Sequence, residues 1–482
     1  MAASSERRVT TQEAMERAAA LHHAGKRAEA AAIYRRVLEV EPQNADALHL
    51  LGIVTRQSGK PKEAIGLIRQ AIALKGENPN YVSNLGTAFE AAGDIEDALA
   101  AYRRAITLMP DYPEPHQKLG ALLQAKGRHK EALAPLQRAV ELRPEALDWQ
   151  LSYGNVLMSL GRLQDAAAVF SRITARDPKQ SEAHFRLGNA LFTLKRKDEA
   201  LASFCRAVEA KPDHDAALFA ITTLLMEKRE PQALVAACDD AFKTDPGNRR
   251  MISSKIVALH ELGRRDEAHA LLGMDPFMRP VEIATPAGYA DLNVFNAALA
   301  EEIRSHPTLV FEKSGHATKF GGHTGDILID PGPAVAALES AIRAAVADYF
   351  REVPSDATHP WFAAKPAKWK LQSWAVVMGV QGHQMPHIHP AAWLSGVYYV
   401  KIPVMGPPSR DPQAGWIEFG RPQDNMFVTA EPELKLYTPK EGMMILFPSY
   451  LFHRTVPIET KEQRISIAFD VLAADSTSRG PY

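Results

Sequence analysis

The sequence predicts a multidomain protein in which an all-α solenoid is followed by an α+β domain built on a β-barrel or jelly roll. Two observations predict this. In the first part of the chain glycines recur every 34 residues, at Gly52, Gly86, Gly120, Gly154 and Gly188. After about residue 275 the period stops, five of the six tryptophans occur, and short β-branched or aromatic runs are separated by glycine and proline. We therefore expect domains at 9–275 and 276–482.

Length and composition indicate a globular protein with more than one domain. At 482 residues the chain exceeds what one hydrophobic core usually serves, and 46% apolar and 23% charged residues are ordinary values. The net charge of −1 indicates neither a nucleic-acid nor a membrane partner. We expect no transmembrane helix and no secretory signal, because the sequence has no long apolar run and its first residues are rich in charge. Cys205 and Cys238 provide no disulfide framework. We expect a cytoplasmic protein, with the oligomeric state left open.

Each unit of 34 residues has the residues of a helix pair. A second glycine follows the first by seven residues, where a turn between helices favours positive φ. Small residues suit positions where two helices cross closely, and a proline ends the second helix and starts the next unit. The recurring positions are Gly59, Gly93, Gly127 and Gly161; Ala64, Ala98, Ala132, Ala166 and Ala200; and Pro110, Pro144, Pro178, Pro212 and Pro246.

This pattern resembles the tetratricopeptide repeat family, which has the same period and the same small positions. The resemblance covers about residues 9–275 and indicates about eight units, of which those after Pro212 are degenerate. It implies a right-handed solenoid whose concave groove binds a protein or peptide. The alternative is that the array only tethers or dimerises the second domain.

The second part of the chain begins with helices and continues with strands. A linker that contains proline, 274–286, precedes two amphipathic helices at 290–306 and 334–349. Five strands are predicted after Pro360, at 371–380, 394–403, 416–419, 442–447 and 464–472. Two helices before a run of strands are typical of helices that back a β-barrel or jelly roll.

Three histidines in the strand region have the pattern of a metal site. His387 and His389 point the same way if that stretch is extended, and His453 would complete one face from a distant strand end. Three ligands on one face leave positions open for substrate and dioxygen, as in non-haem iron oxygenases.

Arg464 and Ser466 share one face of the last strand. A guanidinium inside a small barrel needs an anionic partner, and its fork of donors suits a carboxylate.

These residues resemble the 2-oxoglutarate and Fe(II)-dependent oxygenase superfamily, and within it a group of bacterial oxygenases. The matching segments lie within about residues 282–472, at 387–390, 393–399, 415–420, 447–453 and 464–469. The resemblance implies a double-stranded β-helix that uses Fe(II) and 2-oxoglutarate. It implies that Fe(II) is bound by His387, His389 and His453, and 2-oxoglutarate by Arg464 and Ser466. The implied reaction is a hydroxylase-type oxidation by dioxygen, coupled to decarboxylation of 2-oxoglutarate to succinate, with no catalytic residue beyond the metal site.

The ligand set stays open because His389 stands where the superfamily usually has an acid. One alternative is that His387 and His453 bind the metal alone and water fills the place of the acid. His383 is a further candidate, but its spacing and its glycine neighbour favour a loop role. Glu418 could be a ligand, although a paired carboxylate at the rim is the stronger interpretation.

Four other polar residues have both a structural and a functional interpretation. Tyr399 has the parity of His389 and could line the pocket, but a core position is favoured. Lys401 is expected at a solvated strand end. His316 and His323, in the glycine-rich run 311–326, are expected in an ordinary loop, with substrate contact on a lid as the alternative.

Two other functions remain as hypotheses. Gly442, Pro448 and His453 have the spacing of a cupin motif, which would make the domain a metal protein without 2-oxoglutarate. The missing glutamate shortly after His389, and the presence of Arg464, argue against a cupin. A scaffold for protein interactions, whose oxygenase domain has lost turnover, would explain the missing acid. We predict the dioxygenase, with the repeats recruiting its substrate.

Overall fold

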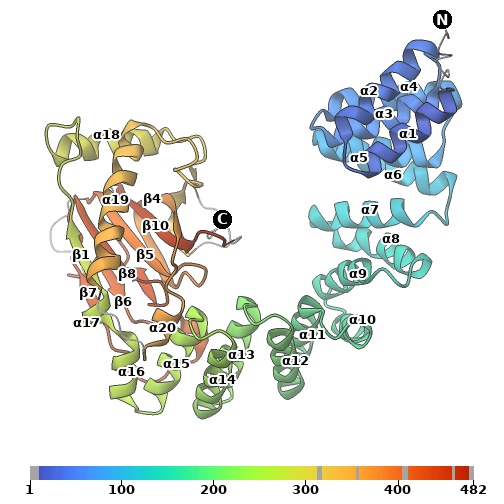
Figure 1. The fold of residues 1–482 in the computed structure, drawn as a ribbon. Helices are drawn as coiled ribbons and strands as arrows, with labels where there is room; N and C mark the ends of the chain where they lie inside the picture. The colour runs from blue at the N-terminus through green and yellow to red at the C-terminus, as the bar shows by residue number, and fades with distance from the viewer. Residues whose placement is uncertain (1–9, 312–316, 354–357, 404–410, 459–461, 477–482) are drawn as a thin grey trace, which may run out of the picture. The chain divides into compact units, whose positions relative to one another are not determined.

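The computed structural model describes residues 10–311, 317–353, 358–403, 411–458 and 462–476. The chain divides into two compact units, Met1–Ala200 and Leu201–Tyr482. Helices alone make up the described part of the first unit, whereas the second combines helices with a sheet (Figure 1). The predicted fold class, an α-helical repeat solenoid followed by a jelly-roll domain, is confirmed.

The first unit is a stack of helix pairs in which consecutive helices pack against each other (Figure 1). Its helices are α1 (Thr11–His23), α2 (Arg27–Val40), α3 (Ala45–Gln57), α4 (Pro61–Lys75), α5 (Pro79–Ala92), α6 (Ile95–Leu108), α7 (Pro113–Ala125), α8 (His129–Leu142), α9 (Leu147–Ser159), α10 (Leu163–Arg176) and α11 (Ser181–Thr193). The next helix, α12 (Lys197–Ala210), crosses the boundary between the two units.

The recurring small residues act as the sequence predicted. A Cβ atom added at Gly86 of α5 would lie 2.8 Å from the ring of Tyr102 on α6, so the close helix crossing requires a glycine there. Gly93 follows α5 with φ of 86°, in the left-handed region that glycine adopts without steric cost. One glycine therefore permits the crossing and the other permits the turn.

After α12 the second unit continues with further helices, most of which contribute to its apolar core. They are α13 (Asp215–Glu227), α14 (Pro231–Thr244), α15 (Arg249–Glu261), α16 (Arg265–Leu272) and α17 (Met274–Phe277). Ile252 and Ile256 of α15, with Leu272 of α16, belong to the same apolar cluster as the residues of the sheet. Helices that continue the repeat pattern thus pack as part of the strand-rich unit. The domain limits 9–275 and 276–482 stay predictions about where the repeats end.

One curled antiparallel sheet carries the described strands of this unit. The strands are β1 (Arg279–Glu282), β2 (Val310–Phe311), β3 (Thr318–His323), β4 (Trp369–His387), β5 (Leu394–Lys401), β6 (Ile417–Phe419), β7 (Lys435–Tyr437), β8 (Met443–Pro448), β9 (His453–Thr455) and β10 (Arg464–Ala473). Their order is β1-β8-β5-β10-β4-β9-β6-β7, and β3 pairs with both β2 and β4. The 3-10 helix η1 (Asp424–Met426) precedes β7.

Two helices pack on the sheet as predicted, α18 (Leu292–Arg304) and α19 (Pro333–Glu352). The hydroxyl of Tyr398 on β5 donates to Oδ1 of Asn296 on α18 over 2.7 Å. A short helix, α20 (Pro360–Ala363), places Trp361 parallel to Trp393, with ring centroids 4.3 Å apart and indole N–H groups that donate to each other's carbonyl oxygens. The helix-facing side of the sheet is therefore a dry, aromatic-rich core.

The sequence-based interpretation missed several of the short strands, although it predicted the three-residue β6 at 416–419. The segment expected as a linker contains β1, which pairs with β8 from Arg279 opposite Leu446 to Glu282 opposite Met443. Such strands have too few residues to show alternation, and their pairing partners lie far away in the sequence.

Candidate metal centre

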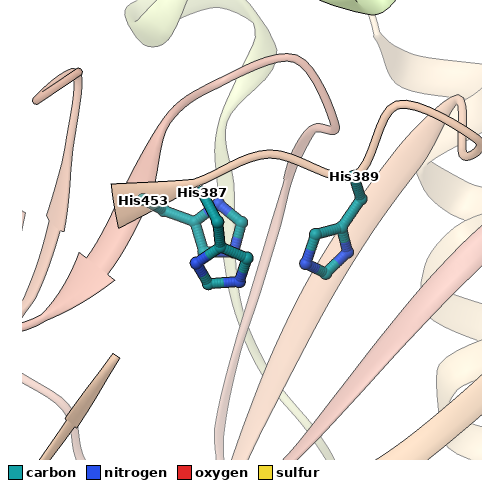
Figure 2. Close-up of side chains that lie close together, drawn as sticks. All are labelled: His387, His389 and His453. Carbon is teal, nitrogen blue, oxygen red and sulfur yellow. The ribbon is translucent and has the colours of Figure 1, made fainter. Parts of the chain in front are cut away.

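Three histidines from separate backbone positions converge at one end of the sheet. His387 is the last residue of β4, His453 is the first of β9, and the two are paired in register. His389 lies in the segment after β4, where its backbone N–H donates to the carbonyl oxygen of Ser449 over 3.0 Å. One ligand nitrogen from each ring lies within 4.8 Å of the others, and Figure 2 shows the ring of His387 in front of that of His453, with His389 to one side. The predicted grouping is thus present.

Hydrogen bonds determine which nitrogen of each ring is available. Nδ1 of His387 lies 2.8 Å from the carbonyl oxygen of Met385, and Nδ1 of His453 lies 3.1 Å from that of Leu451. Nδ1 of His389 lies 2.7 Å from Oδ1 of Asp470. Because a carbonyl or carboxylate oxygen can only accept, each Nδ1 carries the hydrogen. Each Nε2 then has a lone pair free for a metal ion.

The protonation state also suits metal binding. Burial, and then the neighbouring His389, lower the pKa of His387 from 6.5 to about 3. Burial and the two other rings lower the pKa of His453 well below its ordinary value. Both imidazoles are therefore neutral at physiological pH, which is the form that ligates metal ions.

Arg464, at the start of β10, is a buried cation without a negative partner among the described residues. Arg464 is 2% exposed, and its Nη1 donates to the carbonyl oxygen of Gly415 over 2.6 Å. Nε has no hydrogen-bond partner in the described part of the chain. The guanidinium carbon lies 5.2 Å from the ring centroid of Tyr399, whose buried hydroxyl likewise has no partner there. Two orphaned donors around a buried cation fit an anion that is not part of the protein.

Comparison with known proteins agrees with this arrangement. Residues 372–470 match the family model described as "Putative 2OG-Fe(II) oxygenase". The segments 21–86, 88–127, 118–181 and 164–215 match models of tetratricopeptide repeats. The chain contains tetratricopeptide repeats and a domain of this 2OG-Fe(II) oxygenase family. No curated protein matches the chain.

Several solved structures are similar to part of the chain. YrrB, described as a TPR protein with an unusual peptide-binding site, is 22% identical over 39% of this chain and 96% of its own, with a TM-score of 0.36. MamA is 23% identical over 36% of this chain and 94% of its own, with a TM-score of 0.32. PilF of Pseudomonas aeruginosa is 18% identical over 42% of this chain and 92% of its own, with a TM-score of 0.38. At these scores none of them carries a conclusion on function.

The last strand of the oxygenase domain contributes more to the site than the sequence suggested. Arg464, Ser466 and Asp470 alternate along β10 and therefore share one face. Ser466 is buried and lies opposite Tyr399 of β5 in the sheet register. Asp470 lies farther along the same face and contacts His389. Sequence reasoning missed Asp470, although its parity with Arg464 was the signal that could have found it.

The contacts of Tyr399 and Glu418 bear on the two interpretations that the sequence left open for each residue. Tyr399 is buried, as expected for a core residue, and its ring faces the guanidinium of Arg464. Glu418 forms ion pairs with Arg421 and Arg454 and takes no part in the histidine group. Burial raises the pKa of Glu418, but hydrogen bonds from both arginines outweigh it and lower the pKa overall. The paired carboxylate was the right interpretation, although Glu418 is buried rather than at an open rim.

The remaining candidates lie outside the histidine group. His383 bonds through Nδ1 to the carbonyl oxygen of Gln381 over 2.8 Å. His323 was expected in a loop but is the last residue of β3, buried, with Nε2 bonded to Thr318. His316 lies outside the described residues. Lys401 is the half-buried last residue of β5. Within the described parts of the chain, no helix is long and apolar enough to cross a bilayer.

Proposed function

We propose that the strand-rich domain is an Fe(II)- and 2-oxoglutarate-dependent dioxygenase of the hydroxylase type. One observation carries the proposal: Arg464 is a fully buried guanidinium without a negative partner in the described residues, and it shares a domain with three convergent imidazoles. The family match over residues 372–470 supports the same reaction class. Dioxygen would supply one oxygen atom to a substrate C–H bond and the other to succinate, with carbon dioxide leaving from 2-oxoglutarate.

The residues at the histidine group fit the iron that the family implies. His387, His389 and His453 each hold Nδ1 in a hydrogen bond, which leaves Nε2 to face a metal ion. When bound there, Fe(II) would supply the redox chemistry that activates dioxygen. The protein's part is to hold the three rings in place from a strand end, a strand start and a buried loop. His387 is less buried than His389 and His453, so the site is more accessible on the side of His387.

The interior face of β10 fits the distal carboxylate of 2-oxoglutarate. A carboxylate beside Arg464 would accept from Nε and neutralise the guanidinium, and the hydroxyl of Tyr399 would donate a further bond. Ser466, two residues along the same face, offers another hydroxyl. Bonding to all three groups would distinguish a five-carbon 2-oxo diacid from shorter or uncharged 2-oxo acids. The cupin hypothesis gives Arg464 no partner, and we therefore place it second.

We further propose that the repeats recruit a protein or peptide substrate. The support is the match of residues 21–215 to a family whose members bind peptides in a concave groove. Helices α15 and α16, which continue the repeat pattern, contribute residues to the apolar core of the strand-rich unit. Recruitment would raise the local concentration of a weakly bound substrate at the histidine site.

Formation of succinate tests the enzyme hypothesis. The full chain, purified without oxygen, is mixed with Fe(II) and 2-oxoglutarate, exposed to oxygen, and assayed for succinate without added substrate. We expect slow turnover that is lost in His453→Ala and in Arg464→Ala. Arg421→Ala is the matched control, because it removes an arginine just after β6 whose ion-pair partner in the described contacts is Glu418.

The binding of each ligand separates the hypotheses when turnover is slow. Binding of Fe(II) and of 2-oxoglutarate by the wild type, with 2-oxoglutarate lost in Arg464→Ala, supports the dioxygenase. Binding of Fe(II) without 2-oxoglutarate would favour a cupin-type metal protein. Binding of neither would favour a scaffold without catalytic activity.

A further inference from the structure

We propose that Asp470 is a positioning residue of the metal centre, which orients His389 and returns to the site, through that ring, the negative charge that an acidic ligand supplies elsewhere in the superfamily. The inference rests on the proposed metal site. It concerns a residue that would not touch the metal itself. Nδ1 of His389 lies 2.7 Å from Oδ1 of Asp470, so the carboxylate lies on the side of the ring opposite to Nε2.

The contacts around Asp470 form a closed set of three residues. Ser395 on β5 lies opposite Asp470 in the register and donates its hydroxyl to the same Oδ1 over 2.6 Å. The same hydroxyl oxygen lies 3.3 Å from Nδ1 of His389. Two rigid strands therefore fix the carboxylate, and the carboxylate fixes the ring.

His389 needs this fixation more than the other two histidines do. His387 and His453 are paired strand residues, and their Nδ1 atoms donate to carbonyl oxygens only two residues away in the chain. His389 lies past the end of β4, and its ring is held by a carboxylate 81 residues away. Of the three, it is also the one whose Nδ1 contacts a carboxylate side chain and not a backbone carbonyl. A carboxylate acceptor makes Nε2 a stronger donor to a metal than a carbonyl acceptor does.

Charge balance points in the same direction. Asp470 is 1% exposed, and among the described residues its only ion-pair partner is His389, with no lysine or arginine within reach. Burial of a carboxylate without a cation nearby is unfavourable. A divalent cation on Nε2 of His389 would lie across the ring from Asp470 and offset that cost. His389 and Asp470 together would then present to the metal ion a negative charge like that of a single carboxylate ligand.

Titration with Co(II), which gives visible absorption bands when bound, measures the effect without any turnover. The full chain is titrated anaerobically as wild type, Asp470→Asn, Ser395→Ala, His389→Ala and the double variant His389→Ala/Asp470→Asn. We expect Asp470→Asn to weaken Co(II) binding about 10- to 100-fold. We expect a smaller loss for Ser395→Ala, because the carboxylate remains. Glu418→Gln is the matched control, since it removes a buried carboxylate whose partners are arginines, and should leave affinity unchanged.

The double variant shows whether Asp470 affects Co(II) affinity through the ring of His389 or only through its charge near the site. With His389 removed, Asp470→Asn should cause no further loss, because Asp470 acts through that ring. A second readout is the set of exchangeable Nδ1–H proton resonances that Co(II) shifts in bound histidines. We expect one of them to move or vanish in Asp470→Asn, and the same one to be missing in His389→Ala.

Two results would overturn the inference. One is Co(II) binding in Asp470→Asn that equals the wild type, and the other is an equal loss in the presence and absence of His389. A wild type that binds no Co(II) would instead remove the metal site, and this inference with it. If Asp470→Asn does not fold, as judged by its thermal transition, Ser395→Ala decides by the same criteria.

Discussion

Arg249, the first residue of α15, donates from Nε to the carbonyl oxygen of Pro390, 2.9 Å away and one residue beyond His389. A second bond runs from Nη1 to the carbonyl oxygen of Gly247 over 3.1 Å. Burial lowers the pKa of Arg249 from its ordinary value, and nearby aspartates only partly oppose this. A helix that continues the repeat pattern thus holds the loop that carries a candidate metal ligand.

Replacing Arg249 with Gln should therefore affect both stability and metal binding. Loss of a charged hydrogen bond to a carbonyl should lower the free energy of unfolding by about 1–3 kcal/mol. Release of the loop after His389 should weaken Co(II) binding several-fold. Arg250→Gln is the control, because Arg250 pairs with Asp215 and does not contact the loop. Equal effects of the two substitutions on Co(II) affinity would refute the role of Arg249.

Tyr399→Phe should separate ligand binding from stability. The hydroxyl of Tyr399 is buried without a hydrogen-bond partner in the described residues, so its removal should leave stability unchanged or raise it by about 1 kcal/mol. The same change should weaken 2-oxoglutarate binding about 5- to 10-fold, since one hydrogen bond contributes about 1 kcal/mol. Isothermal titration and chemical denaturation measure the two effects.

Tyr398→Phe is the matched control for this prediction. Its hydroxyl donates to Asn296 on the helix-facing side of the sheet, so we expect lower stability and unchanged 2-oxoglutarate binding. If Tyr399→Phe lowered the stability and left 2-oxoglutarate binding unchanged, Tyr399 would be a core residue without a role in binding.

Two glycines of the repeats should respond with opposite signs to replacement by alanine. A Cβ at Gly120 would lie 3.2 Å from the backbone nitrogen of Leu136 and closer still to its side chain, so Gly120→Ala should destabilise the repeats by about 1–3 kcal/mol. A Cβ at Gly66 would meet nothing within 4 Å, so Gly66→Ala should stabilise helix α4 by about 0.5–1 kcal/mol. Thermal unfolding tests both, and a destabilising Gly66→Ala would contradict this packing.

The first unit should lose stability in mild acid because of His49. Its ring is buried 4.3 Å from that of Tyr81, and burial lowers its pKa from 6.5 to about 4, although Asp46 opposes the shift. Between these two pH values the unfolded chain binds a proton that the folded chain excludes, so stability is complete above pH 6.5 and falls as the pH drops. The loss from this group is at most about 3 kcal/mol.

Denaturation of the full chain at several pH values checks this prediction. His49→Gln removes the titrating group and should flatten the dependence of repeat stability on pH between 6.5 and 4. An unchanged slope in that variant would show that other groups cause the acid sensitivity.

Much of the fold followed from periodicity. The repeat of 34 residues located the helix crossings, and the apolar spacing located α18 and α19 to within a few residues. The strands β5, β8 and β10 were predicted close to their observed bounds because each is long enough to show its pattern. Strands of two to four residues, such as β1, β2 and β9, exist because a partner strand pairs with them, and a single stretch of sequence does not contain that partner.

The sequence predicted the three histidines of the candidate site, but it did not predict the residues that hold them in place. Alternation suggested that His387 and His389 point the same way, yet β4 ends at His387, and His389 is placed by bonds to Ser449 and Asp470 instead. Those partners are 60 and 81 residues away from it in the sequence. Only the pairing of strands in the folded chain brings them together.

The most direct test of the central claim is anaerobic titration of the Fe(II)-loaded full chain with 2-oxoglutarate, followed by visible absorption. A 2-oxo acid that chelates Fe(II) through its keto and carboxylate oxygens gives a charge-transfer band. We predict this band in the wild type, its loss in His453→Ala, and its appearance only at much higher 2-oxoglutarate concentration in Arg464→Ala. A wild type that binds Fe(II) but gives no band and no 2-oxoglutarate binding would contradict the proposed function.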